Sequence, residues 1–268
     1  MTSPNESLND SMATTDNTTN VPSGGTGRSP EPLLTLRGVT KTYGAIVSVR
    51  DVDLDVYGGE VIGLIGDNGA GKSTIVGMMS GVTRPTAGQI SVEGTPVRLT
   101  TTAAAREHGI ETVFQNLALV DCMSVWRNFF MGREFRRGPL MDTAKMKAEA
   151  SKGLTAMGLA NLRDINAPVS GLSGGERQAL SMGRAVYFRR KVLVLDEPTS
   201  ALSSVETDRV FGYVRSAKAA GLAVIVILHN LDQCMKVADR FVIMRHGEKV
   251  LDTPNTGQSE DELKRAMA

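Results

Sequence analysis

The segment from Gly66 to Thr74, Gly-Asp-Asn-Gly-Ala-Gly-Lys-Ser-Thr, constrains the fold of this chain more than any other stretch. It fits the phosphate-loop pattern G-x-x-x-x-G-K-[ST], and it has the flanks that the pattern requires. The apolar run 61–65 before it is typical of a buried strand, and residues 73–79 after it are typical of a helix. A strand, a glycine-rich loop and a helix in this order predict that the chain binds a nucleoside triphosphate.

The residue types in this loop explain how it would hold the ligand. Glycines allow backbone N–H groups to close around phosphate oxygens, and Lys72 adds a positive charge at the β- and γ-phosphates. The hydroxyl of Ser73 can ligate Mg²⁺. We therefore expect a nucleotide-binding stretch of consecutive residues: Gly66, Asp67, Asn68, Gly69, Ala70, Gly71, Lys72, Ser73 and Thr74.

Length and composition exclude several classes of protein. A chain of 268 residues buries one sizeable core, or one core with a small lobe. The 30 Lys and Arg residues nearly balance the 29 Asp and Glu residues, so we predict no nucleic-acid partner and no anionic membrane surface. The longest apolar runs, such as 222–228, are too short to span a bilayer, and the N-terminus lacks the pattern of a signal peptide.

Cys122 and Cys234 are too far apart for a C-x-x-C site, and we expect both to be small core residues in a reducing cytosol.

The N-terminal part of the chain divides into a tail and a region of short strands. The first 30 residues are dominated by Ser, Thr, Asn, Gly and Pro, which cannot bury enough apolar surface to offset the entropy of ordering. We expect a disordered tail over residues 1–32 and an ordered domain over residues 33–268. Alternating or short apolar runs then predict half-buried antiparallel strands. These runs are 33–36, 46–49, 52–56, 88–92 and 96–99.

Continuous apolar runs at 111–114, 192–195 and 222–228 are typical of parallel strands that are covered by helices on both faces. Between about 118 and 172 the strand signals vanish, which predicts a helical subdomain there. Asp142 can cap a helix in it, and the apolar positions of that helix share one face: Met146, Ala150, Leu154 and Met157. The predicted fold class is α/β, a P-loop NTPase core with a mostly parallel sheet, an N-terminal antiparallel β subdomain and a helical insertion. No internal repeat is visible, so we expect a single cassette.

A second motif, Leu-Ser-Gly-Gly-Glu-Arg-Gln, occupies residues 172–178. Ser173 and Glu176 form a capping box, and the plain reading is the start of a helix over 177–186. A bare capping box does not need Gly174 and Gly175, which weaken a first helical turn. Two glycines expose N–H groups at the positive helix end, where a phosphate is received. Because the chain has only one lysine-bearing loop, we expect this turn to serve the nucleotide of another subunit.

Together with Asp-Glu-Pro-Thr-Ser at 196–200, these motifs resemble the ATP-binding cassette (ABC) ATPases over about residues 33–252. The resemblance implies a head-to-tail dimer that sandwiches two ATP molecules. Each ATP would be held by one phosphate loop and by Ser173, Gly174 and Gly175 of the other subunit.

Two carboxylates, Asp196 and Glu197, end a buried strand, where open α/β sheets place their ligand crevice. Taken alone, such a pair can also be a solvated strand end. The resemblance implies that Asp196 supports Mg²⁺ and that Glu197 polarises the attacking water, two roles that phosphoryl transfer requires.

Three further residues acquire roles from the same resemblance, although each has a plainer reading. His229, which could be a solvated strand end, matches the switch histidine that contacts the γ-phosphate, even though Leu228 replaces the usual Ser or Thr before it. Gln115, which could be simple surface polarity, matches the glutamine that reaches the metal and the attacking water. Tyr43, which could be a turn tyrosine, matches the aromatic side chain that stacks on adenine.

One position indicates a branch of the family. Most members have Asp where this chain has Ser203, and the lack of Asp at this position is similar to the monosaccharide-importer branch. Segments 109–120 and 131–134 are also similar to that branch. Some fructose-type systems in that branch have one cassette per chain. Because the sequence ends at residue 268, we also expect no C-terminal regulatory domain of the kind found in disaccharide importers.

The sequence therefore predicts the ATP-hydrolysing subunit of an importer for a simple sugar, with ATP and Mg²⁺ as cofactors. Its expected partners are integral-membrane permease subunits, a second ATPase subunit and, indirectly, a solute-binding receptor. Its expected location is the cytoplasmic face of the membrane, through the permease. A soluble ABC-type ATPase in translation or DNA repair is the alternative, and a scaffold that does not hydrolyse ATP is a second one.

Overall fold

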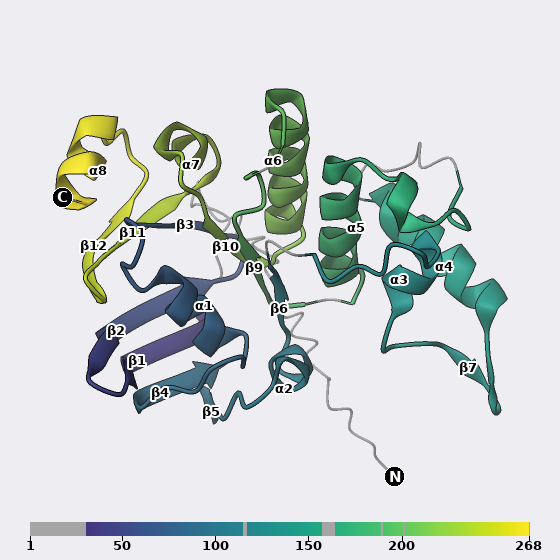
Figure 1. Cartoon of the computed structure of the whole chain (residues 1–268), viewed down its shortest axis with the longest axis horizontal. Helices are drawn as coiled ribbons and strands as arrows, with labels where there is room; N and C mark the ends of the chain where they lie inside the picture. The colour runs from purple at the N-terminus through teal and green to yellow at the C-terminus, as the bar shows by residue number, and fades with distance from the viewer. Residues whose placement is uncertain (1–30, 115–116, 157–163, 189, 201, 268) are drawn as a thin grey trace, which may run out of the picture.

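A six-stranded sheet forms the centre of the molecule (Figure 1). The computed structural model describes residues 31–114, 117–156, 164–188, 190–200 and 202–267. The strand order is β12-β11-β3-β10-β9-β6, and only β12 is antiparallel to its neighbour. The strands are β3 (Val61–Ile65), β6 (Ile110–Val113), β9 (Val192–Asp196), β10 (Ala223–Ile227), β11 (Arg240–Arg245) and β12 (Glu248–Pro254).

The parallel strands bury both of their faces, as their continuous apolar runs predict. Along β9, Val192 and Val194 contact one hydrophobic cluster, whereas Leu193 and Leu195 contact another. The first cluster includes α1 (Lys72–Met79). The second is completed by helices on the opposite face: α6 (Ser204–Ala219), α7 (Leu231–Val237) and α8 (Glu260–Met267). The α/β fold class is thus confirmed.

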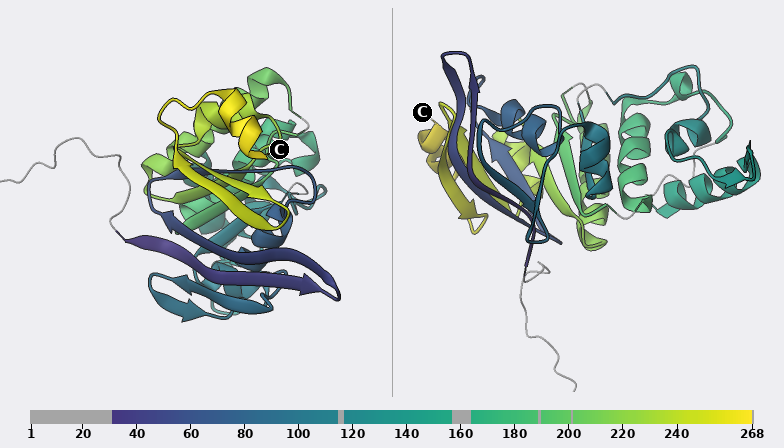
Figure 2. Two further views of the ribbon diagram at one scale, coloured as in Figure 1. Left: turned by 90° about the vertical axis from the view of Figure 1, so that its left-hand side faces the viewer. Right: turned by 90° about the horizontal axis from the view of Figure 1, so that it is seen from below.

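A second, antiparallel sheet packs against the first cluster in the order β2-β1-β4-β5. Its strands are β1 (Pro32–Tyr43), β2 (Ile46–Tyr57), β4 (Ala87–Val92) and β5 (Thr95–Val97). Figure 2 shows this sheet beside the parallel one. The two alternating runs predicted at 46–49 and 52–56 belong to one strand, because β2 continues through Asp51, whose φ is 46°.

The predicted helical insertion is a lobe at one end of the molecule (Figure 1). The predicted range, about 118–172, contains α3 (Val125–Phe130) and α4 (Thr143–Ala156). The lobe extends beyond that range through α5 (Gly174–Tyr187), which shares with α3 and α4 a cluster rich in aromatic rings. Asp142 caps α4 by accepting a hydrogen bond of 3.0 Å from the backbone N–H of Lys145. On the predicted face Met146, Ala150 and Leu154 are buried, while Met157 lies outside the described residues, as does the predicted tail up to residue 30.

Three short elements complete the fold. A hairpin of β7 (Arg136–Arg137) and β8 (Leu140–Met141) lies between α3 and α4, where the sequence gives no strand signal. It was missed because two-residue strands are too short to show periodicity. Helix α2 (Thr102–Glu107) precedes β6, and a short 3-10 helix, η1, spans Val169–Gly171. Among the described residues, no helix is long and apolar enough to cross a membrane.

The two cysteines differ in burial, which corrects the expectation that both belong to the core. Cys122 is exposed, because it lies in the loop before α3, whereas Cys234 is buried between α7 and the central sheet. The Sγ of Cys234 would lie only 2.2 Å from a Cβ atom placed at Gly63, so β3 needs a glycine there. Burial raises the pKa of the Cys234 thiol to about 12.

This difference predicts selective thiol labelling. Only the thiolate attacks a maleimide, so at pH 7 the native protein should take up one label per chain, at Cys122, while Cys234 reacts only after unfolding. Mass spectrometry of the labelled protein measures this. The Cys122→Ser variant should remain unlabelled when native, and a full label on that variant would contradict the burial of Cys234.

Candidate nucleotide-binding and hydrolysis site

The phosphate loop connects the end of β3 to the start of α1 and is packed tightly against neighbouring strands. Gly66, Gly69 and Gly71 have φ values of 149°, 83° and 97°, a region that other residues rarely adopt. A Cβ atom at Gly66 would lie 2.3 Å from the carbonyl oxygen of Met244 in β11. A Cβ atom at Gly71 would lie 2.6 Å from the carbonyl oxygen of Ser48 in β2. The first and last glycines of the motif are therefore required by packing as well as by backbone conformation.

Lys72 is the first residue of α1, and its side chain folds back over the loop. The ammonium group donates hydrogen bonds of 2.6 Å and 2.9 Å to the carbonyl oxygens of Gly66 and Asp67. The residue is only 7% exposed, and this burial lowers the pKa of its amine, while the charges of Glu197, Asp67 and Asp196 raise it. The lysine thus lies within electrostatic reach of the two carboxylates that follow β9.

Two contacts that the sequence does not indicate hold the loop in place. The hydroxyls of Ser48 and Thr74 lie 2.7 Å apart, which ties β2 to the first turn of α1. The backbone N–H of Gly247, in the turn between β11 and β12, donates a 3.1 Å hydrogen bond to the carbonyl of Ala70. Gly247 itself has a φ of 84°. A turn signal is visible at Gly247 in the sequence, but no local pattern indicates which loop the turn will contact.

The acidic pair lies at the edge of the sheet to which the phosphate loop belongs, because β3, β10 and β9 are adjacent and parallel. Asp196 is the last residue of β9, and burial together with the charge of Glu197 raises its pKa, against the opposing effect of Lys72 and His229. Glu197 has a φ of 50°, which is unusual for a residue with a side chain. Its backbone N–H donates a 3.2 Å hydrogen bond to the carbonyl oxygen of Ile227. Such local strain often marks functional positions.

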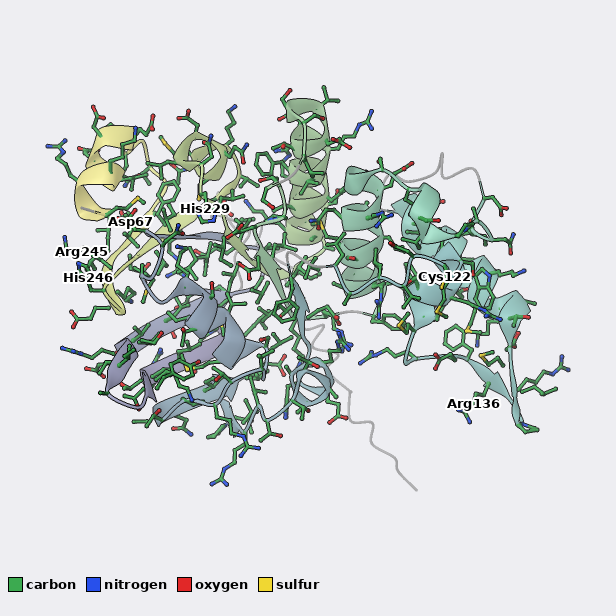
Figure 3. The ribbon with its side chains drawn as sticks, viewed as in Figure 1. Asp67, Cys122, Arg136, His229, Arg245 and His246 are labelled. Atoms are coloured by element: carbon green, nitrogen blue, oxygen red, sulfur yellow. The ribbon has the colours of Figure 1, made fainter. Side chains whose placement is uncertain are left out.

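His229 follows β10 and contacts Glu197 directly. Its Nε2 lies 2.5 Å from Oε1 of the carboxylate, to which it donates a hydrogen bond. The glutamate side chain is 25% exposed and that of the histidine 50% exposed, so both are accessible from solvent. Figure 3 labels His229 and Asp67 in this region of the molecule, and Cys122 and Arg136 in the helical lobe. The resemblance assigns His229 to the γ-phosphate, and the structure adds its hydrogen bond to the glutamate.

The Ser-Gly-Gly turn lies in the helical lobe, at the start of α5. The Ser173 hydroxyl accepts a 3.3 Å hydrogen bond from the backbone N–H of Glu176. In return, the Glu176 carboxylate accepts a 2.8 Å hydrogen bond from the backbone N–H of Ser173. The helix was predicted to begin at residue 177, but it begins at Gly174. This capping box compensates for the low helix propensity of the two glycines. A Cβ atom at Gly174 would lie 2.7 Å from Leu202, whereas one at Gly175 would make only ordinary contacts. Within the described chain, α5 contacts α3, α4, α6 and β6, and its N-terminus is far from α1 in Figure 1.

The remaining predicted residues have different outcomes. Tyr43 ends β1 with its ring 50% exposed and its hydroxyl 3.3 Å from that of Thr83. Gln115 lies outside the described residues. Ser203, noted for replacing Asp, is the N-cap of α6, where its hydroxyl accepts a hydrogen bond from the N–H of Glu206. Serine and aspartate both suit this cap, so the local structure tolerates the replacement.

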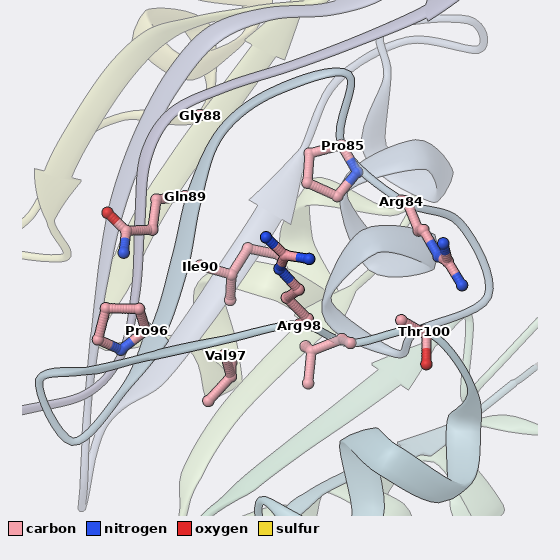
Figure 4. A pocket seen from close by; sticks show the side chains of 10 residues that line it. Arg84, Pro85, Gly88, Gln89, Ile90, Pro96, Val97, Arg98 and Thr100 are labelled. Carbon is pink, nitrogen blue, oxygen red and sulfur yellow. The ribbon is translucent and has the colours of Figure 1, made fainter.

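A cavity of about 620 Å³ lies beside β4 and β5 (Figure 4). It is lined by Arg84, Pro85, Gly88, Gln89, Ile90, Pro96, Val97, Arg98, Leu99 and Thr100. None of these residues belongs to the phosphate loop or to the acidic pair. We therefore do not assign the nucleotide to this cavity.

The fold and the site define a P-loop nucleotide-binding protein: a parallel sheet with a strand, a phosphate loop and a helix, and two carboxylates after a neighbouring strand. Comparison with known proteins specifies the family. The ABC transporter domain matches residues 49–200. The fructose import ATP-binding protein FrcA of Rhizobium meliloti is 41% identical over 227 residues, which cover 82% of this chain and 87% of that protein. This chain therefore belongs to the ABC transporter family.

Other similar proteins agree with this assignment. The xylose/arabinose import ATP-binding protein XylG of Sulfolobus acidocaldarius is 38% identical over 88% of this chain and 93% of its own length. A ribose import ATP-binding protein of Streptomyces avermitilis is 36% identical, but the match spans only 47% of that longer protein. Among solved structures, the ADP conformation of an ATP-binding cassette of an ABC transporter superposes with a TM-score of 0.74 at 25% identity, over 88% of this chain and 94% of that one.

The packing of the loop predicts that two of its glycines respond differently to alanine. Both Gly69→Ala and Gly71→Ala place a side chain at positive φ, which costs about 1–2 kcal/mol. Only Gly71→Ala also meets the Ser48 carbonyl, which adds about 1–3 kcal/mol of overpacking, whereas Gly69 has open space. Denaturant unfolding without nucleotide should therefore give a lower stability for Gly71→Ala than for Gly69→Ala. Equal stabilities would contradict the packing of the loop on β2.

Proposed function

We propose that this chain is the ATP-hydrolysing subunit of an ABC importer and powers the uptake of a simple sugar through a membrane permease. The observation that carries the proposal is the convergence of Lys72, Asp196 and the Glu197–His229 pair at one edge of the parallel sheet. The choice of a sugar rests on relatives named for the import of fructose and of xylose or arabinose, which match this chain over most of their length.

The residues present fit a nucleotide with its Mg²⁺ ion. Gly66 and Gly71 allow the loop backbone to lie against β11 and β2, where a Cβ atom would collide with a carbonyl oxygen. A glycine-rich loop of this kind closes its N–H groups around phosphate oxygens. Mg²⁺ prefers oxygen ligands and is usually held by one or two protein oxygens together with substrate phosphates. Ser73 and Asp196 would supply such a hydroxyl and carboxylate, and Gln115 is the further ligand that the resemblance implies. The ion, when bound, neutralises charge on the β- and γ-phosphates.

Each proposed catalytic residue would then have a separate role in hydrolysis. Lys72 exchanges its hydrogen bonds to two loop carbonyls for the phosphates, and Glu197 accepts the proton of the attacking water. His229 holds the glutamate through its Nε2, and the resemblance implies that it would also contact the γ-phosphate. Gln115 would orient the water, and Tyr43 offers a half-exposed ring to the adenine.

The site would be completed by a second subunit. Ser173, Gly174 and Gly175 begin a helix in the lobe, away from the phosphate loop of their own chain, and present N–H groups that suit a phosphate. A head-to-tail dimer brings this turn to the loop of the partner, which is either an identical chain or a paralogue. The permease holds the dimer at the cytoplasmic face of the membrane, and a solute-binding receptor delivers the sugar. No nucleic acid takes part.

Glu197→Gln tests the hydrolytic role. The change keeps the shape and removes the charge that accepts the proton, so turnover should fall about 10²–10⁴-fold. Lys72, Asp196 and Ser173 are untouched, so ATP should still bind and bridge two subunits. Light scattering with MgATP should show the variant as a dimer and the wild type mainly as a monomer. A variant that hydrolyses at the wild-type rate would remove Glu197 from this role.

Uptake measurements test the transport role. In the source organism, deletion of the gene should abolish accumulation of one labelled monosaccharide among fructose, ribose and xylose. The wild-type gene should restore uptake, and Lys72→Ala should not, because it removes the charge at the phosphates. Unchanged uptake of all three sugars, with the protein recovered on ribosomes or DNA rather than with a membrane protein, would favour the soluble alternative.

A further inference from the structure

Four arginines gather at the junction between the central sheet and the helical lobe. They surround a cavity of about 170 Å³ whose charged lining consists of Arg106, Arg133, Arg184, Arg190, Glu107 and Glu111. The side chains come from α2, β6, the segment after α3, and the end of α5 with the residues that follow it. Four cations therefore face two carboxylates, although the chain as a whole is nearly neutral.

Glu111 compensates two of these arginines. Its Oε1 accepts a 3.0 Å hydrogen bond from Nε of Arg106, and its Oε2 accepts a 3.1 Å hydrogen bond from Nε of Arg190. Arg190 also donates to the carbonyl of Arg106, and it is 7% exposed, while Glu111 is 8% exposed. Both carboxylate oxygens of the buried glutamate are thus engaged by Arg106 and Arg190.

Arg184 and Arg133 form no ion pair with a carboxylate of the described residues. Arg184 donates one hydrogen bond of 3.3 Å, to the carbonyl of Met131. Burial lowers the pKa of its guanidinium, as do the charges of Arg106 and Arg133, while Glu111 opposes them. The guanidinium of Arg133 lies 5.0 Å from the centre of the Phe188 ring, a cation–π contact, and its side chain donates no hydrogen bond to the described residues.

We propose that this cavity is a binding site for an oxyanion, the phosphate or carboxylate group of a small molecule, held between Arg133 and Arg184. Partly buried guanidinium groups repel one another, and the attraction of a bound anion would offset this repulsion and the cost of their desolvation. The planar fork of arginine matches the oxygens of phosphate and carboxylate, and both groups fit the volume. No role of this kind follows from ATP hydrolysis, because the phosphate loop and Glu197 do not line the cavity.

The position of the cavity gives the anion a structural consequence. Arg106 and Glu111 belong to the central domain, whereas Arg133 and Arg184 belong to the lobe that contains the Ser-Gly-Gly turn. An anion held by Arg133 and Arg184 would also face Arg106 of the central domain across the same cavity, so its binding would stiffen the junction between the two parts. The site would couple the level of a small anionic molecule to the placement of the lobe.

Calorimetric titration of the full chain with inorganic phosphate, and separately with malonate, tests the proposal. ADP is kept saturating to occupy the phosphate loop, and chloride keeps the ionic strength constant. We expect the wild type to bind at least one of the two anions, and the two arms tell a phosphate-bearing ligand from a carboxylate-bearing one. Arg133→Gln should bind about tenfold more weakly or not at all, because it loses a charge-assisted pair of hydrogen bonds.

Arg136→Gln is the matched control. It removes the same charge from the exposed β7 strand, outside the cavity lining, and retains the phosphate loop, so its affinity should equal that of the wild type. If Arg133→Gln unfolds, Arg184→Lys provides the test, since it keeps the charge and loses the planar fork. Absence of binding by the wild type, or equal affinities of the Arg133 and Arg136 variants, would overturn the proposal.

Discussion

The close packing of the phosphate loop against strands from two sheets is the constraint on which the rest of the site depends. The carbonyls of Ser48 and Met244 leave no space for a Cβ atom at Gly71 or Gly66, so the loop backbone is fixed from outside. The turn at Gly247 adds a hydrogen bond to Ala70. A loop held in this way keeps its N–H groups oriented before a ligand arrives, which reduces the entropy lost on binding. The antiparallel sheet is therefore part of the nucleotide site, although it contributes few of its expected ligands.

Most of the central site could be predicted from the sequence, because its parts lie at the carboxyl ends of strands whose apolar runs are continuous. Once β3, β9 and β10 are recognised as parallel, Asp196, Glu197 and His229 must lie near the loop. The support from Ser48 could not be predicted, since the pairing of strands distant in sequence has no local signal.

The start of α5 at Gly174 was misjudged because the low helix propensity of glycine was given more weight than a capping box that satisfies two N–H groups. The Cys122 expectation failed for a similar reason: residue type predicts burial only on average.

Charge balance explains how the proposed catalytic groups are arranged. Lys72 is buried among backbone carbonyls, and the carboxylates near it offset the cost of that burial. Asp196 experiences the reverse, since burial and its neighbour Glu197 both disfavour its charged form. Glu197 in turn has His229 as a hydrogen-bond partner at 2.5 Å. Lys72 and Glu197 therefore each have a hydrogen-bond partner that a nucleotide and its metal ion could replace.

Helix α5 connects this chemistry to the arginine cavity. Its first turn carries the Ser-Gly-Gly motif, and its last turn carries Arg184, with Arg190 shortly after its end. A helix of 14 residues is about 21 Å long and resists bending when it is packed on several sides, as α5 is by α3, α4 and α6. A change at one end is then passed to the other as a movement of the whole helix. In the proposed dimer, an anion bound between Arg133 and Arg184 would act on the same rigid element that offers N–H groups to the partner's nucleotide, so the cavity would be placed to bias how readily that composite site assembles.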